Sequence, residues 1–589
     1  YTPMEKNTLS PAFGGMLLIN RFVWMMVGSA TLALSYFTFS FKEKNKKVKA
    51  LKADKAEDTS LFTLPKLNPS YSNQTEWLQF KSFFYTNFLS IMKSSTFKIL
   101  FLFAAIILVS NLFAGFEYFG LKAYPLTYKM VDLISNASGI FVIIILVFFS
   151  GELIWRDRDS KINEVIDATP HTSFISLAAK ALSLVAVTTV LHFVFIFTGI
   201  IYQMLNGFTR IELDVYILDF LASNLVVYIV WSGIMIMIQV LINNKYVGYF
   251  ASILVIFIWD IVLSIIDVQS NMVRVASGPS LRYSDMNGFG PGVYGATWFN
   301  IYWILFGFIC LLIAGALWNR GAMTALKDRI KIARKQVPKS YTNVIGLVSV
   351  LWLLTAGFIY YNTQIVNPYK TSDQLEELSA EYEKKYKKYQ KANLPKITEA
   401  KYFIDIFPSE RNVKVKATLV LTNESNKALD SLHYSYDRNW NPEFLIPNAE
   451  LVFSDEEFDY SIYKLASPMQ PGQSITIDIV TEYKKSGFEN QAGNTNIVEN
   501  GTFLNNFSIL PSFGYSAGSE LSDKNTRKKY GLSPKARMSK LDTTCKNEAC
   551  MSNYLSDGKS DYINVETIIS TSDDQIAIVS SSDSLATFT

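Results

Sequence analysis

The sequence predicts a polytopic α-helical membrane region followed by a mainly β region outside the membrane. Three observations support this fold class: long, largely uncharged apolar runs in the first 362 residues, basic residues concentrated in alternate connections between these runs, and strand-like alternation after residue 395. A helix needs about 20 apolar residues to cross the hydrocarbon core of a bilayer. We therefore expect about eight spans, at residues 22–41, 99–116, 133–151, 181–204, 220–242, 246–266, 298–318 and 344–361.

The lysine and arginine residues between the runs predict the orientation of the spans. One set of alternate connections contains 23 of these residues and the other set contains 7. Because basic connections remain in the cytoplasm, we expect both Tyr1 and the region after residue 361 to lie outside. No basic and apolar leader precedes the first run. We therefore expect the sequence to be internal to a longer protein with further spans upstream.

Composition excludes some classes of partner. The net charge of +4 is small, and no basic stripe with interleaved aromatic residues occurs, so we expect no nucleic-acid partner. Of the three cysteines, Cys310 lies in an apolar run, whereas Cys545 and Cys550 could form one disulfide in an oxidising compartment. Two thiolates with no matching pair elsewhere do not predict a metal site.

The segment 42–95 combines a Lys-rich cytoplasmic linker with an amphipathic stretch. Apolar and aromatic side chains recur at near-helical spacing from Trp77 to Ile91, beside Lys81 and Lys93. This pattern is typical of an elbow helix that lies in the membrane surface. A linker helix packed on the protein itself would show the same pattern.

The segment 151–170 contains a dense run of charges. Trp155, Ile162 and Val165 lie among these charges, and Pro170 would end a helix here. A short amphipathic cytoplasmic helix could insert into a groove of a partner, whereas charge runs of this kind often face solvent in a loop. The candidate partner-binding residues are Glu152, Trp155, Arg156, Asp157, Arg158, Asp159 and Glu164.

Residues 74–321 resemble the permease half of type-2 ABC exporters. The resemblance rests on six spans, an amphipathic segment before the first, the string Gly-Glu-Leu-Ile-Trp-Arg-Asp-Arg-Asp after the second, and the longer connection 267–297 before the last. It implies a six-span unit at 96–321 in which 151–170 is the coupling helix that docks on a dimer of ATPase subunits. It also implies that 1–41 contains the last span of a preceding permease half, and that 322–362 is a basic linker with a connecting span.

The chain has no Gly-x-x-x-x-Gly-Lys-Ser/Thr loop that could bind ATP phosphates. ATP would therefore act through a partner subunit, and we expect no cofactor in this chain.

Two ionisable residues lie inside predicted spans, Asp260 and His192. Such residues are costly in a membrane and often functional. Two simpler interpretations remain open. Asp260 could lie at the outer interface beside Asp267, and His192 could be a neutral, hydrogen-bonded packing residue.

The region after the last run changes from helical to strand-like periodicity. Spacing and i,i+4 charge pairs predict a helical stalk at 363–395. From 396 to 589, alternating stretches such as 413–421 and 474–480 predict an antiparallel sandwich or saddle.

Three strings in this region, at 465–472, 500–507 and 565–578, resemble the amino-terminal β domain of the aminopeptidase N family of zinc metallopeptidases. That family holds zinc with His-Glu-x-x-His and a later Glu, because the metal needs three protein ligands and an open position for water. None of the three histidines here belongs to such a pair: His171, His192 and His433. We therefore expect no catalytic residue and no metal ligand. Zinc is expected only if a catalytic domain follows Thr589.

These observations favour the permease subunit of an ABC exporter in a bacterial inner membrane, with a periplasmic peptidase-like accessory domain and a peptide or protein as a candidate substrate. Two alternatives remain. The chain could be the membrane anchor and first part of a zinc aminopeptidase, or a non-enzymatic scaffold whose outer domain binds a partner.

Overall fold

The computed structural model describes residues 14–38, 73–535 and 563–579, apart from residues 115, 119–120, 170, 319, 322–324, 441, 494 and 506–508. The chain separates into two compact units, residues 1–70 and 71–589, which are treated separately below. The first unit contains α2 (Met16–Thr38), whose side chains are exposed within this unit. The predicted linker before residue 73 and the pair Cys545 and Cys550 lie outside the described residues.

Eight helices in the described part of the chain are long and apolar enough to cross a membrane, which makes this a multi-pass membrane protein. Each of them overlaps one predicted span, and each begins before the predicted first residue. Besides α2 they are α4 (Ser95–Ala114), α5 (Thr127–Asp159), α7 (Ser173–Leu205), α8 to α9 (Leu213–Leu241), α10 (Lys245–Ile265), α11 (Gly292–Ala316) and α13 with η2 (Lys339–Val366). A π-helical segment, η1 (Phe220–Asn224), joins α8 (Leu213–Asp219) to α9 (Leu225–Leu241).

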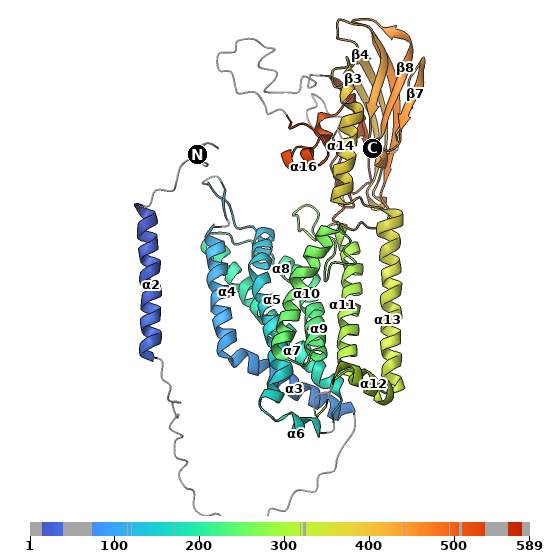
Figure 1. Cartoon of the computed structure of the whole chain (residues 1–589). Coiled ribbons are helices and arrows are strands. Elements are labelled where there is room, and N and C mark those ends of the chain that lie inside the picture. Colours follow the sequence, from blue (N-terminus) through green and yellow to red (C-terminus); the bar gives the residue numbers. More distant parts are fainter. Residues whose placement is uncertain are drawn as a thin grey trace, which may run out of the picture. The chain divides into compact units, whose positions relative to one another are not determined.

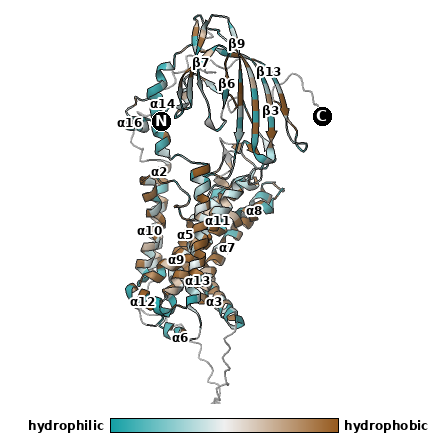
Figure 2. Cartoon of the chain, turned by 90° about the vertical axis from the view of Figure 1, so that its right-hand side faces the viewer, coloured by the Kyte–Doolittle hydropathy of each residue, from teal (hydrophilic) through white to brown (hydrophobic). Residues whose placement is uncertain are grey.

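Six of these helices, from α4 to α11, share one apolar core with part of α13 (Figures 1 and 2). Small residues permit a close approach of the backbones of α9 and α11. A Cβ atom added at Gly233 would lie 2.5 Å from the carbonyl oxygen of Gly307. Close backbone contact of this kind stabilises helix pairs in membranes through packing rather than through the hydrophobic effect.

One end of the helical bundle carries three further helices, and we call it the basic end (Figure 1). They are α3 (Asn73–Lys93), α6 (Asn163–Asp167) and α12 (Leu326–Gln336). Helix α3 packs on α7, where the Ser183 hydroxyl donates to the Phe84 carbonyl over 3.1 Å, yet Trp77 and Leu78 are more than half exposed. One face of the predicted elbow helix is therefore packed on protein, and the other presents apolar side chains.

The β region consists of two sheets that share one core. The five-stranded sheet has the order β13-β3-β4-β9-β6 and the four-stranded sheet has the order β12-β5-β8-β7. All pairs are antiparallel except β13 with β3. Buried Leu419 and Ile477 of the first sheet join Leu432 and Tyr434 of the second in one apolar cluster. The strands are β3 (Lys396–Phe407), β4 (Asn412–Thr422), β5 (Leu429–Ser435), β6 (Glu443–Leu445), β7 (Ala449–Asp455), β8 (Tyr460–Met469), β9 (Ser474–Lys484), β12 (Ser512–Phe513) and β13 (Asn564–Ser570).

Short elements complete the second unit. Two small hairpins are formed by β1 (Glu117–Tyr118) with β2 (Leu121–Lys122) and by β10 (Ile497–Val498) with β11 (Gly501–Thr502). Helix α14 (Ser372–Tyr386) falls in the segment expected to be a helical stalk, and α16 (Lys524–Lys529) packs against it. A buried ion pair connects α14 and α16, in which Arg527 donates to both carboxylate oxygens of Glu383 over 2.7 and 2.8 Å.

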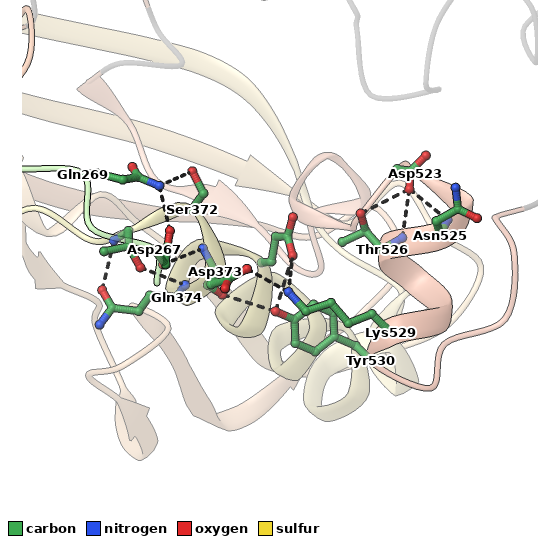
Figure 3. A network of polar contacts seen from close by, with 12 residues as sticks. Asp267, Gln269, Ser372, Asp373, Gln374, Asp523, Asn525, Thr526, Lys529 and Tyr530 are labelled. Carbon is green, nitrogen blue, oxygen red and sulfur yellow. Dashed lines mark hydrogen bonds and ion pairs between the residues drawn. The ribbon is translucent and has the colours of Figure 1, made fainter. Parts of the chain in front are cut away.

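The loop between α10 and α11 contacts the start of α14, and we call this the sheet end of the bundle (Figure 3). The Asp267 carboxylate accepts from the backbone N–H of Asp373 and from Gln269, whose amide also donates to Ser372. The hydrogen bond from the Thr371 hydroxyl lowers the pKa of Asp267. A carboxylate at a helix N-terminus satisfies free backbone donors and interacts favourably with the helix dipole.

Candidate functional site

The predicted coupling segment 151–170 is not one separate helix. Residues up to Asp159 form the last turns of α5, and only the five residues of α6 form a helix of their own. The sequence pattern misplaced this boundary because the charges end the apolar run at Gly151, whereas the helix continues as long as its backbone bonds and charged side chains find partners. Six of the seven candidate residues are therefore on α5, and Glu164 alone is on α6.

Tight packing against α9 and α10 fixes the end of α5. The Trp155 indole N–H donates to Gln239 Oε1 on α9 over 3.2 Å. Gly151 allows the approach of α10, since a Cβ atom there would lie 2.2 Å from the Tyr249 ring. Trp155 is buried, so it does not present a surface to a partner.

Charges of α5 form ion pairs and hydrogen bonds with three other helices. Lys180 of α7 is almost fully buried and donates to the Leu153 carbonyl over 2.5 Å and to the Asp157 carboxylate over 3.2 Å. Lys245, at the start of α10, bridges Glu152 Oε2 at 2.8 Å and Asp159 Oδ2 at 3.0 Å. The interpretation of this run as a solvated charged loop is therefore wrong for these residues.

The two arginines of the segment are also held against the protein. Arg156 donates to Ser90 Oγ over 2.7 Å and to Asn87 Oδ1 over 2.9 Å, and both acceptors lie on α3. The Arg158 guanidinium lies over the rings of Trp155 and Trp318, 5.4 and 5.2 Å from their centres. We call the contacts of α5 with α3, α7, α9 and α10 the basic-end network.

Helix α6 presents the outward surface of this site. Ile162 is 47% exposed and Val165 is 71% exposed, and Glu164 between them is exposed as well. The far end of α6 is tied to the turn after α11, where Asp167 Oδ2 accepts from the backbone N–H of Gly321 over 2.9 Å. Ile162, which directly precedes α6, and Val165 within it are thus exposed apolar side chains on a segment that follows α5 and whose far end is bonded to the turn after α11.

The connection from α6 to α7 is held by Arg320, which donates to the His171 carbonyl and to Ser173 Oγ. Partial burial, together with the positive charge of Arg320, lowers the pKa of His171. On α12, buried Arg329 donates to the carbonyls of Val240 and Leu241 over 2.6 and 2.8 Å and so satisfies the free end of α9.

The two ionisable residues predicted inside spans lie apart. Asp260 lies in the last turns of α10 near the sheet end, and its side chain is exposed within this unit. His192 is buried on α7, where Nδ1 lies 3.1 Å from the Tyr228 hydroxyl, beside the Phe220 ring. This geometry fits the interpretation of His192 as a packing residue.

Two aspartates that the sequence prediction missed lie near the sheet end. Asp219 is buried where α8 meets η1 and accepts from Asn224 over 3.1 Å. Asp132, on α5, lines a cavity of about 410 Å³ with Asn111 and Asn136. Asp219 directly precedes the predicted span 220–242, so it was counted with a connection. A π-helical turn has no simple sequence signal.

The described residues of the β region form none of the groupings that hold a metal ion. Among the described residues, no cluster of three or more His, Cys, Asp and Glu side chains has this arrangement. His433 packs against Tyr389, and its Nδ1 lies 2.9 Å from the Tyr460 hydroxyl. Burial lowers the pKa of His433.

Comparison with known proteins adds no assignment: no protein-family model matches the chain, and no curated protein matches it.

Proposed function

We propose that the chain is the permease part of an ABC-type exporter that is driven by a separate ATPase. The single observation that supports this function best is the construction of α6. Exposed Ile162 and Val165 offer an apolar contact to a partner at the basic end, while the residues on both sides of them are fixed to the bundle. Apolar side chains that a partner desolvates are typical centres of protein interfaces.

In this proposal the basic-end network transmits the movement of the ATPase. A push on α6 acts on α5, which ion pairs connect to α7 through Asp157 and Lys180 and to α10 through Glu152 and Lys245. The hydrogen bond between Asp167 and Gly321 connects α6 to the turn after α11 as well. When the ATPase closes, these helices tilt, and this tilting is the conformational change of an alternating-access mechanism.

The coupling test uses α6 rather than the charges of α5. Replacing the charges of α5 would break internal ion pairs and would change the bundle itself. The double variant Ile162→Asp with Val165→Asp changes only exposed side chains. We expect the vanadate-sensitive ATP hydrolysis that copurifies with the tagged chain to fall at least about tenfold in this variant, because a charge buried in an interface is costly.

The matched control is Val452→Asp, since Val452 is half exposed on β7, far from the basic end in sequence. Full copurification of stimulated ATPase with the α6 double variant would contradict the coupling role. Absence of any ATPase with the wild-type chain would contradict the proposed function as a whole.

The proposed topology puts the basic end in the cytoplasm and the β region in the periplasm of a bacterial inner membrane. The support is the charge asymmetry of the connections, 23 against 7. In a chain whose own three cysteines are replaced by serine, a membrane-impermeant thiol reagent applied to intact spheroplasts should modify a cysteine placed at the exposed Asn426 but not one placed at Lys47. The reverse labelling pattern would overturn this orientation.

A further inference from the structure

A second cavity, of about 310 Å³, lies where the loop between α10 and α11 meets the residues after β9. Its lining contains one cation, Arg274, and the side-chain amides of Gln269, Asn271 and Gln491, together with Ser280. No aspartate or glutamate lines it. Cavities of this size accommodate small organic ligands.

Hydrogen bonds hold the walls of this cavity in place without a ligand. Asn490 is 1% exposed, accepts from the backbone N–H of Asn271 over 2.9 Å and donates to the Gln269 carbonyl over 3.0 Å. On the helical side, the Trp303 indole donates to the carbonyls of Asn271 and Ser277 over 3.2 and 2.9 Å. Loop residues fixed in this way lose little conformational freedom when a ligand binds.

Arg274 is the group that these contacts leave unexplained. Its Nε atom is buried and has no hydrogen-bond partner within the described part of the chain, and no ion pair joins its guanidinium to a described carboxylate. A buried charged donor without an acceptor is costly, and native structures rarely retain one without a reason. A guanidinium that lines a polar cavity without an acid has the chemistry of an anion site.

We propose that this cavity binds the carboxylate end of a short peptide. The Arg274 guanidinium would bind the carboxylate through paired N–H donors. The N–H groups of the Gln269 amide are already used by Asp267 and Ser372, so Gln269 and Asn271 offer their side-chain oxygens to adjacent peptide N–H groups, and Gln491 offers a whole side-chain amide. A single cation surrounded by neutral amides suits one negative charge better than it suits a phosphate dianion. This proposal does not depend on an ATPase or on transport, since it concerns binding by the chain itself.

The test is calorimetric titration of the full chain in phosphatidylcholine nanodiscs. The probes are N-acetyl-Ala-Ala as the free acid, the same compound as its C-terminal amide, and inorganic phosphate. We expect saturable, one-to-one binding of the acid, and binding at least about tenfold weaker for the amide. Arg274→Gln should weaken binding of the acid by a similar factor. The control Arg282→Gln, an exposed arginine of the same loop that does not line the cavity, should bind as wild type does.

Several results would overturn the proposal. Equal binding of the acid and the amide would overturn it, and so would unchanged binding of the acid by Arg274→Gln. The third such result is binding heat that depends on Arg274 but appears only with phosphate, or only when the nanodiscs contain phosphatidylglycerol, which would indicate a site for a lipid headgroup. Thermal unfolding of each variant shows whether it is folded. If Arg274→Gln is not folded, Gln491→Ala on the opposite wall decides, because its side chain is exposed and its loss should still weaken binding of the acid several-fold.

Discussion

Replacing Asp157 with asparagine removes the carboxylate that faces the Lys180 ammonium. The lysine side chain is 3% exposed, and its other described acceptor is the Leu153 carbonyl. Two unit charges about 3 Å apart attract each other by about 5 kcal/mol at an effective dielectric constant near 20. Removing one partner of a buried pair costs about 3–5 kcal/mol. Because the Leu153 carbonyl remains, we expect Asp157→Asn to lower the free energy of unfolding by about 3 kcal/mol.

Substitution of the other partner, Lys180, should lower the free energy of unfolding by less. Lys180→Met removes the buried charge itself, while Asp157 is 19% exposed and keeps Arg156 Nε at 3.5 Å. We expect a loss of about 1 kcal/mol, as is typical of partly exposed pairs. The double variant should lose no more than about 1 kcal/mol, so the pair should show a coupling energy of at least about 3 kcal/mol.

Reversible unfolding of the three variants and the wild type in mixed detergent micelles measures these energies. The refuting result is additivity. If the two single losses sum to the loss of the double variant, or if Asp157→Asn is as stable as wild type, Lys180 does not depend on this carboxylate and the basic-end network does not connect α5 to α7 in the way described.

Three further predictions concern other parts of the chain. Gly151→Ala should destabilise the bundle by about 1–3 kcal/mol because the new methyl group overlaps the Tyr249 ring; thermal unfolding checks this, and an unchanged midpoint would contradict it. Arg527, by hydrogen bonding, lowers the pKa of Glu383. This carboxylate thus stabilises the fold above its unfolded pKa of about 4.3 and loses that effect as the pH falls through the lower folded value. Glu383→Gln should flatten the acid limb of a stability–pH curve, and a curve of unchanged slope would disprove the assignment. The purified chain should contain no stoichiometric zinc and leave an amino-acid anilide uncleaved, because none of its three histidines belongs to a His-Glu-x-x-His pair; elemental analysis and a chelator-controlled assay test both points.

The spans could be predicted from the sequence because the bilayer imposes a simple requirement, about 20 apolar residues in a row. The ends of the helices could not. After Gly151 the chain becomes highly charged, yet α5 continues to Asp159 because its charges meet partners from distant segments. Lys245 is 93 positions from Glu152, and Asn87 is 69 positions from Arg156. No local pattern shows such pairs.

The β region shows the same division between local and distant information. Alternation predicted β4 and β9, whose inward side chains include Leu419 and Ile477. It could not predict that β13 adds to β3 in parallel, because the two strands are more than 150 residues apart. The cavity lined by Arg274 and Gln491 was not predictable either, since hydrogen bonds between Asn490 and the loop residues Asn271 and Gln269 join its two walls across more than 200 positions of the sequence.

The cap that Asp267 provides for α14 has a consequence for communication across the membrane. The residue belongs to the loop that joins two spanning helices, and it holds the first turn of the helix that leads into the β region. A change in the spacing of α10 and α11 that moved Asp267 would therefore weaken this support of α14. Thermodynamic linkage makes such an effect reciprocal, so that any ligand that stabilises one position of α14 must favour the matching arrangement of the spans by the same free energy.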